Sequence, residues 1–427
     1  MAGHPAGERE VKTSFPKDKI RVVLVENIHA RGAAMLREEG FAVETMTGSP
    51  DRSKLLRLLK EAHVLGIRSK TDLPAVVQDA APRLLAVGCF CIGTNQVDLA
   101  HARGRGLPVF NSPFSNTRSV AELTIAEVVA LSRRLVDQSA RMHAGTWDKS
   151  AAGAHEVRGR TLGIVGYGHI GSQVSVLAEA MGMRVIFHDI APKMALGNAR
   201  SVRDLSALLK EADVVTLHVP ATGATRNLIG AAQIRKMKPG AHLINNARGS
   251  VVDVVALAEA LRSGHLGGAA LDVFPHEPAS GEEPFESEVR GLPNVILTPH
   301  VGGSTEEAQE AIAEDVAAKL IKFINVGTTT GSVNVPEVEL PGQEAADEHG
   351  RSARRRHRIL HFHRNVPGVL SSLHRVVAGL GANITSEYLR TLDDIGYVVL
   401  DVDPTNGKEL LTRLRAMPET VRVRILW

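Results

Sequence analysis

Short apolar runs alternate with amphipathic stretches along most of the chain, beginning at residue 20. The run IRVVLVE (20–26) has the length and β-branched content of a buried strand, and AAMLREE (33–39) has the apolar spacing of a helix. The alternation continues to residue 111 through FAVET, SKLLRLLKEA, HVLGI, LPAVVQDA, RLLAVG, VDLAHARG and PVFN. Strands that alternate with helices through short turns predict a parallel sheet with helices on both faces.

A second series of the same kind begins at residue 161 with TLGIVGYGHIG. It continues through MRVIFHD, ADVVTLHVP, AHLINNA, GGAALDVF and NVILTPH. Residues 117–141, between the two series, predict one long helix, and residues 306–323 predict another after the second series. The pattern therefore predicts two α/β units in succession.

The sequence pattern changes near residue 328. From there to residue 356, Gly, Pro and charged residues replace the periodic apolar positions. Such a stretch is typical of a linker. The remaining segment returns to regular patterning, in the order RILHFH, PGVLSSLHRVVAGL, ANITSEYLR, GYVVLDVD, GKELLTRLRAM and VRVRILW. This order predicts a compact βαββαβ module at the C-terminal end.

Composition narrows the class of protein. With 427 residues, 44% hydrophobic and 23% charged, the chain is long enough for two or three globular domains. A net charge of +3 gives no reason to expect a nucleic-acid partner. The basic run RSARRRHR (351–358) admits a phosphate or nucleic-acid patch, but a solvated linker is the interpretation we favour.

The chain also lacks several special signals. It has no apolar run of about 18 residues, so we expect no membrane span. The polar N-terminal segment 1–17 has no signal-peptide pattern and predicts a disordered tail. The two cysteines, Cys89 and Cys91, predict neither a disulfide framework nor a metal site, and they fit a reducing cytoplasm.

A glycine-rich turn opens the second α/β series. Gly166, Gly168 and Gly171 form G-x-G-x-x-G directly after an apolar strand and before a helix. These glycines permit a tight turn, close approach of a pyrophosphate and close packing of the helix, whose N-terminus faces the phosphates. Asp189, at the end of the next strand, can bind ribose hydroxyls and would repel a 2′-phosphate. The motif therefore predicts an NAD site, to which His169 contributes mainly its backbone.

Three side chains in this series suit the oxidation of an alcohol by hydride transfer. That reaction needs a base poised near neutral pH and a cation for a substrate carboxylate. Arg248, Glu277 and His300 each follow an apolar run, so a parallel sheet would bring them to one edge. We expect His300 to be the base, Glu277 to hold its ring and raise its pKa, and Arg248 to bind the carboxylate.

The blocks GYGHIG, NNARGSVVD, AALDVFPHEP and LTPHVGGST resemble the signature segments of the D-isomer-specific 2-hydroxyacid dehydrogenases. The resemblance implies the Arg, Glu and His roles just given and places Asp272 at the nicotinamide end of the cofactor. Residues Asn246-Ala247 depart from the Ala-Ser that relatives often have. The resemblance implies a wider set of NAD contacts, namely Gly166, Gly168, His169, Ile170, Gly171, Asp189, Asn246, Ala247, Arg248, Asp272, His300, Gly302 and Gly303.

Similarity to the members of this family that act on a phosphorylated substrate extends from residue 19 to residue 427, through GCFCIGTNQVDL and FNSPFSNTRSVAEL. It implies that Arg68, Lys70 and Asn116 bind substrate together with Arg248 and His300. Arg118 is a further polar candidate, but a surface residue at the start of a helix explains it equally well. The implied substrate is 3-phospho-D-glycerate, oxidised with NAD to 3-phosphohydroxypyruvate.

The C-terminal module resembles an ACT domain, which binds amino acids. This resemblance implies that His363, Asn365 and Asn383 bind L-serine at the interface between two such modules. It also implies that the protein is a homotetramer and that serine, the end product of its pathway, inhibits it. Two alternatives stay open. One is a reductase for another 2-oxo acid such as 2-oxoglutarate, and the other is an NADH-sensing binding protein on the same scaffold.

The resemblance also implies the domain boundaries. Residues 18–114 plus 305–334 would form a discontinuous substrate-binding domain with a flavodoxin-like sheet. Residues 115–304 would form a Rossmann-type, doubly wound NAD-binding domain, followed by a linker (335–354) and the ACT domain (355–427).

Overall fold

The computed structural model of the 427-residue chain describes residues 15–278, 283–342 and 356–426. The chain divides into two compact units, Met1–Pro113 with Glu310–Trp427 (unit 1) and Phe114–Gln309 (unit 2). Most of the expected N-terminal tail (1–17) lies outside the described residues, and a short 3-10 helix, η1 (Lys17–Lys19), begins at the last residue of that tail. None of the helices in the described part of the chain combines the length and hydropathy that a membrane-spanning helix requires.

The first series of apolar runs in unit 1 forms a five-stranded parallel sheet in the order β2-β1-β3-β4-β5, which is the flavodoxin-like order that we expected. Its strands are β1 (Arg21–Leu24), β2 (Ala42–Thr45), β3 (Val64–Ile67), β4 (Ala86–Cys89) and β5 (Val109–Asn111). Four of the five strands are buried along most of their length, because helices cover both faces of the sheet.

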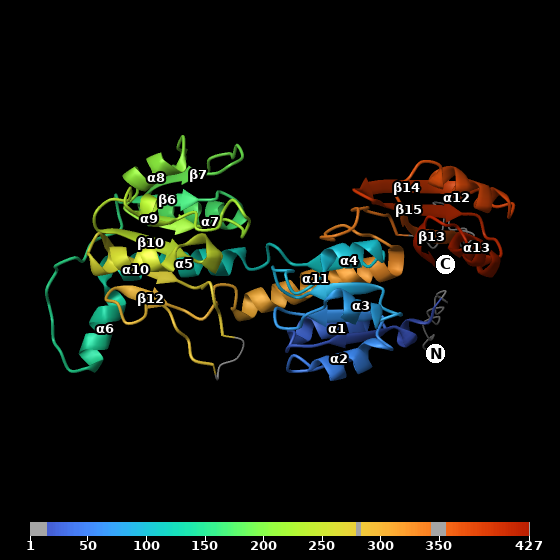
Figure 1. The fold of residues 1–427 in the computed structure, drawn as a ribbon, viewed down its shortest axis with the longest axis horizontal. Helices are drawn as coiled ribbons and strands as arrows, with labels where there is room; N and C mark the ends of the chain where they lie inside the picture. The colour runs from blue at the N-terminus through green and yellow to red at the C-terminus, as the bar shows by residue number, and fades with distance from the viewer. Residues whose placement is uncertain (1–14, 279–282, 343–355, 427) are drawn as a thin grey trace, which may run out of the picture. The chain divides into compact units, whose positions relative to one another are not determined.

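Two groups of helices cover this sheet. The first face packs against α1 (Ala30–Glu38) and the long α11 (Glu306–Val326), which begins in unit 2 and continues in unit 1. The second face packs against α2 (Arg52–Leu59), α3 (Ala75–Asp79) and α4 (Leu99–Gly104). These helices form the blue layers of Figure 1 together with part of the orange α11.

Unit 2 contains a seven-stranded, wholly parallel sheet in the order β12-β11-β10-β9-β6-β7-β8. This is the Rossmann order extended by one strand, and it confirms the predicted fold class. In Figure 1 the strands run in colour from green to orange, and they are β6 (Thr161–Val165), β7 (Arg184–His188), β8 (Arg200–Ser201), β9 (Val214–Leu217), β10 (Ala241–Asn245), β11 (Leu266–Leu271) and β12 (Val295–Leu297).

Helices again cover both faces. One face packs against α5 (Thr117–Arg133) and α7 (His169–Ala180). The other packs against α8 (Leu205–Glu211), α9 (Ala231–Ile234) and α10 (Val254–Arg262), and a 3-10 turn, η2 (Gly249–Val251), precedes α10.

The prediction of a single helix over residues 117–141 is wrong. Arg134 adopts a left-handed conformation with φ of 51°, which ends α5 and starts a separate helix, α6 (Leu135–His143). The apolar pattern runs on through the break, and an arginine at this position gives no sign of it. No residue of α6 is buried.

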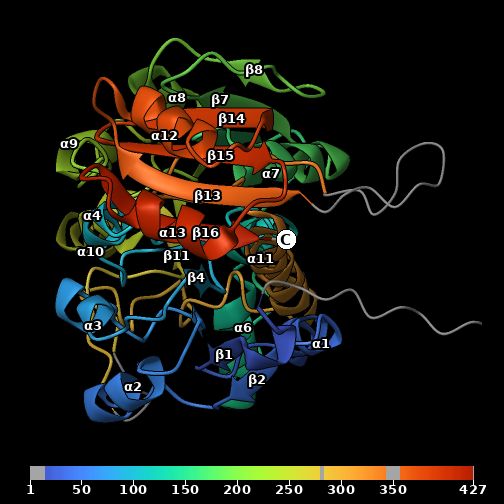
Figure 2. The same ribbon diagram turned by 90° about the vertical axis from the view of Figure 1, so that its right-hand side faces the viewer.

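The C-terminal module has the predicted βαββαβ order and an antiparallel sheet arranged β14-β15-β13-β16. Its two helices cover one face of the sheet, as Figure 2 shows in the red part of the ribbon. The opposite face, with Leu360, Phe362 and Tyr397, joins the apolar core around α1 and α11. The elements are β13 (His357–Arg364), α12 (Val369–Ala378), β14 (Ile384–Leu392), β15 (Ile395–Val402), α13 (Gly407–Arg415) and β16 (Thr420–Leu426).

The linker interpretation fails for the parts of the stretch that the structure describes. Val335, Val338 and Leu340 are buried in the core of unit 1, although nothing in their spacing is periodic. Within the basic run, residues 351–355 lie outside the described residues. Arg358 is 1% exposed and holds the carboxylate of Asp401 through two hydrogen bonds of 2.7 Å, so it belongs to a buried ion pair rather than to a solvated linker.

Candidate active site

A histidine–glutamate pair stands at the carboxyl ends of two neighbouring strands of unit 2. Glu277 follows β11, His300 follows β12, and the Nδ1 atom of His300 lies 2.9 Å from Oε2 of Glu277. The backbone N–H of Phe274 donates to the other oxygen of Glu277 at 3.1 Å, which fixes the carboxylate. Because Nδ1 is held by the carboxylate, Nε2 is the ring nitrogen left to accept a proton from a substrate.

The electrostatics of the pair favour a charged imidazole. The hydrogen bond that Glu277 accepts from His300 is the main reason that the pKa of His300 is raised, and this effect outweighs partial burial, which acts in the opposite direction. Burial, the largest single effect, pushes the pKa of Glu277 upward, but the hydrogen bonds from His300 and Phe274 together with the charges of His300 and Arg248 leave this pKa lowered. The geometry therefore suits a general base that becomes a stabilised cation after it takes a proton.

Asp272 supports the loop that carries His300. The side chain is 1% exposed and accepts the N–H groups of Val301 at 2.8 Å and Gly302 at 2.7 Å, together with the hydroxyl of Thr298. Its negative charge also contributes to the raised pKa of His300. The family resemblance implies that Asp272 contacts the cofactor, and the structure adds that its carboxylate fixes the loop of the candidate base.

Arg248 follows β10, the next strand of the sheet, and is half-buried. Its Nη1 donates to the carbonyl oxygen of Ala247 at 2.7 Å, and its own carbonyl accepts from the side chain of Asn245 at 3.0 Å. The Arg248 charge acts to lower the pKa of both Glu277 and His300. It therefore belongs to the same electrostatic site, where a guanidinium suits a substrate carboxylate.

The glycine turn after β6 has the shape that a dinucleotide requires. Gly166 has φ of 91°, and a Cβ atom there would lie 2.5 Å from the carbonyl oxygen of His218. A Cβ at Gly171 would lie 2.2 Å from the carbonyl oxygen of Gly166, so the helix and the turn are in close contact. At Gly168, in contrast, a Cβ would meet no described atom within 4 Å, which leaves the backbone open to a phosphate. The residues present fit the cofactor.

The rest of the turn is fixed by Asp189, which directly follows β7. One carboxylate oxygen accepts the N–H of Tyr167 at 2.8 Å and the other accepts the N–H of Ala191 at 3.0 Å. This side chain is half-buried, so a fixed negative charge stands where a ribose is expected. The ring of His169 packs against Phe114 with 3.9 Å between ring centroids and an angle of 35° between the ring planes, and Ile170 packs against the apolar core beneath α7.

A buried polar cluster between α5 and the segment after β10 was not predicted. Asn246 donates from Nδ2 to Oε2 of Glu127 at 2.7 Å and to the hydroxyl of Thr124 at 3.1 Å. Burial raises the pKa of Glu127 to about 8, against the smaller opposing effect of the hydrogen bond from Asn246. Both Glu127 and Thr124 lie on α5, so this helix orients the segment that carries Arg248.

Asn116 lies at the start of α5, 7% exposed, with its amide against Gly303. Gly302 is likewise tightly placed, because a Cβ there would lie 2.9 Å from Oδ2 of Asp272. Arg118 is exposed and pairs with Glu122 one helical turn away, as expected for a residue that decorates a helix start. The structure thus brings Asn116, but not Arg118, to the loop that carries His300.

Arg68 and Lys70 lie in unit 1, in the loop that follows β3. Arg68 is half-buried and Lys70 is exposed. No ion pair joins either side chain to another residue in the part of the chain that the structure describes. The loop therefore presents two cations at the carboxyl end of the five-stranded sheet.

Of the predicted effector residues, His363 and Asn365 lie two residues apart in sequence at the end of β13. His363 is 3% exposed and its Nδ1 lies 2.8 Å from the carbonyl oxygen of Arg364, while Asn365 donates to the carbonyl oxygen of Asp393 at 3.1 Å. Asn383 lies at the opposite end of the sheet. His363 is paired with Gly396 at one end of β15, and Ile384 is paired with Val402 at the other end, so Asn383 lies roughly 20 Å away along the strands.

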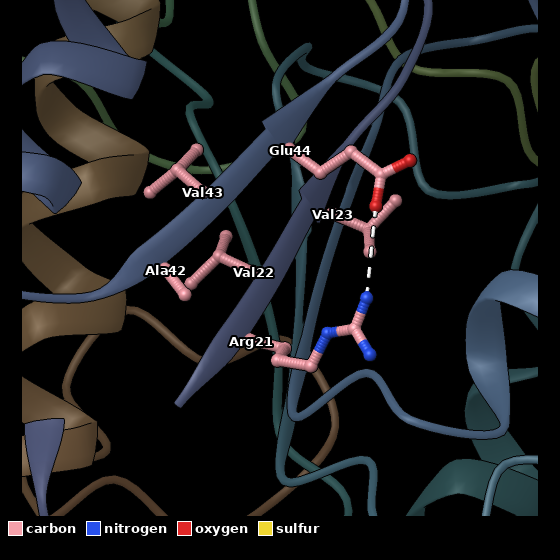
Figure 3. Close-up of a pocket in the computed structure, with 6 residues that line it drawn as sticks. All are labelled: Arg21, Val22, Val23, Ala42, Val43 and Glu44. Carbon is pink, nitrogen blue, oxygen red and sulfur yellow. Dashed lines mark ion pairs between the residues drawn. The ribbon is translucent and has the colours of Figure 1, made fainter. Parts of the chain in front are cut away.

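Figure 3 shows a cavity of about 330 Å³ that has no part in this chemistry. Its walls come from β1 and β2, and Arg21 and Glu44 point toward one another across it at 4.0 Å. It contains none of the predicted site residues.

Comparison with known proteins identifies the family to which the chain belongs. Residues 125–302 match the model of the D-isomer specific 2-hydroxyacid dehydrogenase NAD binding domain, and residues 359–422 match that of the AHAS small subunit-like ACT domain. A parallel nucleotide-binding sheet with a His–Glu pair and an arginine at its edge is what a nicotinamide-dependent dehydrogenase of hydroxy acids requires. The chain belongs to the D-isomer specific 2-hydroxyacid dehydrogenase family.

The similarity to several members extends over nearly the whole chain. D-3-phosphoglycerate dehydrogenase of Dictyostelium discoideum is 49% identical over 97% of this chain and 99% of its own length. The Escherichia coli K12 enzyme of the same name is 50% identical over 97% of this chain and all of its own.

Among solved structures, D-lactate dehydrogenase from Aquifex aeolicus, complexed with NAD and lactic acid, covers 71% of this chain and 95% of its own length. It matches with a TM-score of 0.63 and 29% identity.

Proposed function

We propose that this protein is a D-3-phosphoglycerate dehydrogenase, which oxidises 3-phospho-D-glycerate to 3-phosphohydroxypyruvate with NAD in the first step of L-serine biosynthesis. The observation that carries the chemistry is the 2.9 Å contact between His300 and Glu277 beside Arg248. The choice of substrate is supported by relatives of that name that match the chain from end to end at about half identity.

In this reaction Nε2 of His300 takes the proton of the substrate hydroxyl, and Glu277 stabilises the resulting imidazolium. Arg248 binds the substrate carboxylate. NAD, when bound, accepts the hydride from the substrate carbon that carries this hydroxyl group. Gly166, Gly168 and Asp189 would hold the cofactor, and the other predicted NAD contacts remain part of this proposal.

The phosphate end of the substrate is assigned to unit 1. Arg68 and Lys70 offer two cations without an ion-pair partner among the described residues, and a phosphate ester carries close to two negative charges at neutral pH. Asn116 contributes a polar group beside the loop of His300. Location in the cytoplasm is part of this proposal, and a chain with only two cysteines, Cys89 and Cys91, fits a reducing compartment.

Feedback by L-serine is assigned to the ACT domain through His363, Asn365 and Asn383. The third of these residues lies at the far end of the sheet from the first two, so one chain does not assemble the site by itself. Two modules placed edge to edge in antiparallel fashion would bring Asn383 of one chain to His363 of another. This geometry supports a regulatory site shared between two copies.

A second surface supports assembly into a homotetramer. Leu135, Val136 and Met142 on α6 are between 47% and 57% exposed, and Trp147 beyond the helix is 73% exposed. Such an apolar face on a helix without any buried residue suits a contact with another copy of the chain.

Formation of NADH from NAD tests the proposal, with 3-phospho-D-glycerate and with unphosphorylated D-glycerate as substrates. We expect a much higher kcat/KM for the phosphorylated substrate, and inhibition when L-serine is added. Equal values for both substrates would point instead to a dehydrogenase or reductase of another 2-oxo acid. Tight NADH binding without turnover would point to a sensor.

A further inference from the structure

Glu26 is a buried carboxylate that the sequence pattern did not reveal. It lies two residues beyond the end of the buried strand β1, in a left-handed conformation with φ of 62°, and it is 7% exposed. Its carboxylate accepts the backbone N–H groups of Arg68 at 3.1 Å, Lys70 at 2.9 Å and Thr71 at 2.8 Å. One side chain therefore receives three main-chain hydrogen bonds from a loop that is distant in sequence.

The position of this contact in the sheet is informative. In the order β2-β1-β3, the direction of winding reverses between β1 and β3, and ligands of such sheets bind at the carboxyl ends of the strands at this point. Glu26 follows β1 and the loop with Arg68 follows β3, so the carboxylate bridges the two strand ends where an anionic ligand would otherwise meet the backbone.

Convergent backbone N–H groups form a concavity that binds anions. In this loop the concavity is filled by the protein's own carboxylate, so its amides are not free for a substrate. Further contacts restrain the loop from two other sides, since Gln96 donates to the carbonyl oxygen of Arg68 and Ser49 lies 3.4 Å from that of Lys70. The backbone is therefore held in place while the charged side chains of Arg68 and Lys70 have no ion-pair partner among the described residues.

We propose that Glu26 is a positioning residue for recognition of the substrate's phosphate: it occupies the amide concavity of loop 68–71 and thereby leaves the phosphate to the side chains of Arg68 and Lys70. The inference rests on the proposed function and deepens it. An amide concavity binds any small anion, whereas two cationic side chains on a fixed backbone favour a dianion over a neutral hydroxyl group. Glu26 would thus support the preference for a phosphorylated substrate without touching that substrate.

The substitution Glu26→Gln tests this role. Glutamine has a single acceptor oxygen, and its NH₂ group would face backbone N–H donors, so the loop should lose its fixed conformation. We expect KM for 3-phospho-D-glycerate to rise roughly tenfold. We expect kcat, the KM for D-glycerate and the affinity for NADH to stay within about twofold of those of the unmodified protein.

The matched control is Glu44→Gln, which makes the same change at an exposed glutamate on β2 of the same sheet. It should leave both KM values unchanged. A merely structural role for Glu26 would raise both KM values together or lower kcat, and either result would overturn the inference. An unchanged KM for the phosphorylated substrate would overturn it as well.

Two further outcomes are separable. If the unmodified protein does not prefer the phosphorylated substrate, the proposed function fails before the role of Glu26 is reached. If Glu26→Gln does not give folded protein by circular dichroism, Glu26→Asp is measured in the same way. Aspartate keeps the charge but is one methylene shorter, so an unchanged preference for the phosphorylated substrate in that variant would reject the positioning role.

Discussion

The two parallel sheets reverse their winding at comparable places, between β6 and β9 in unit 2 and between β1 and β3 in unit 1. The backbone amides at these two places differ, because they are open in unit 2 and already hydrogen-bonded in unit 1. In unit 2 the first strand leads into Gly166 and Gly168, where the backbone above the second glycine is open. In unit 1 the first strand leads into Glu26, whose carboxylate already occupies the amides of the facing loop.

The difference separates two kinds of anion recognition. An open glycine turn at a helix N-terminus binds a pyrophosphate through the backbone, which is uniform chemistry that suits a common cofactor. A filled concavity leaves binding to side chains, which can be chosen for one substrate. Changes at His300 or at the glycine turn of unit 2 should therefore alter turnover or NADH binding, whereas changes in the loop of unit 1 should alter KM.

The largest effect is expected for His300→Ala, which removes the proposed base from the edge of the sheet in unit 2. Turnover should fall at least ~100-fold, the usual contribution of a general base, while NADH titration stays near normal. The control is His276→Ala, because this exposed neighbour of Glu277 has no ion-pair partner among the described residues. If both variants lost activity equally, His300 would not be the base.

Glu277→Gln should lower kcat by less than His300→Ala does, and it should also move the pH profile. Glu277 is the main cause of the raised pKa of His300, and oxidation requires the unprotonated ring. The rate of the unmodified protein should thus decline as pH falls through this raised pKa. In the variant the pKa of His300 is lower, so the decline should begin at lower pH in plots of kcat/KM. A profile that does not move would contradict the assigned role of Glu277.

The fold was largely predictable because both sheets consist of apolar runs in regular alternation with helices. The break at Arg134 was not, because the pattern continues through it and only the backbone turns left-handed. The burial of Val335 and Val338 was missed for a related reason, since isolated apolar residues among prolines and glycines have no period to detect.

The position of His300, Glu277 and Arg248 at one edge of the sheet was predictable because each stands in a long and specific block after a strand. Glu26 was not, although it ends the run IRVVLVE. Its partners are main-chain N–H groups, which have no sequence signature, and they become neighbours only through the strand order β1-β3. The pair of Glu127 and Asn246 was missed likewise, since α5 and the end of β10 are far apart in sequence.

Gly166→Ala tests the open turn of unit 2. A Cβ would lie 2.5 Å from the carbonyl oxygen of His218 at a φ of 91°, and backbone strain of about 1–3 kcal/mol corresponds to roughly 5- to 150-fold weaker NADH binding. Gly145→Ala is the control, because this glycine also has positive φ, 83°, but open space around a Cβ and no place in the site. Fluorescence titration with NADH should separate the two, and equal loss in both would show that the turn itself is unimportant.

Arg68→Ala is expected to have the smallest effect, because it removes one of two cations and leaves the backbone held by Glu26. KM for 3-phospho-D-glycerate should rise about fivefold to tenfold, with kcat and NADH affinity little changed. Arg83→Ala serves as control, since Arg83 is an exposed arginine of unit 1 already paired with Glu61. Steady-state kinetics with both substrates decide the point. A fall in kcat with unchanged KM would mean that Arg68 acts in the chemical step and not in substrate binding. The proposed difference in function between the two sheets would then be wrong.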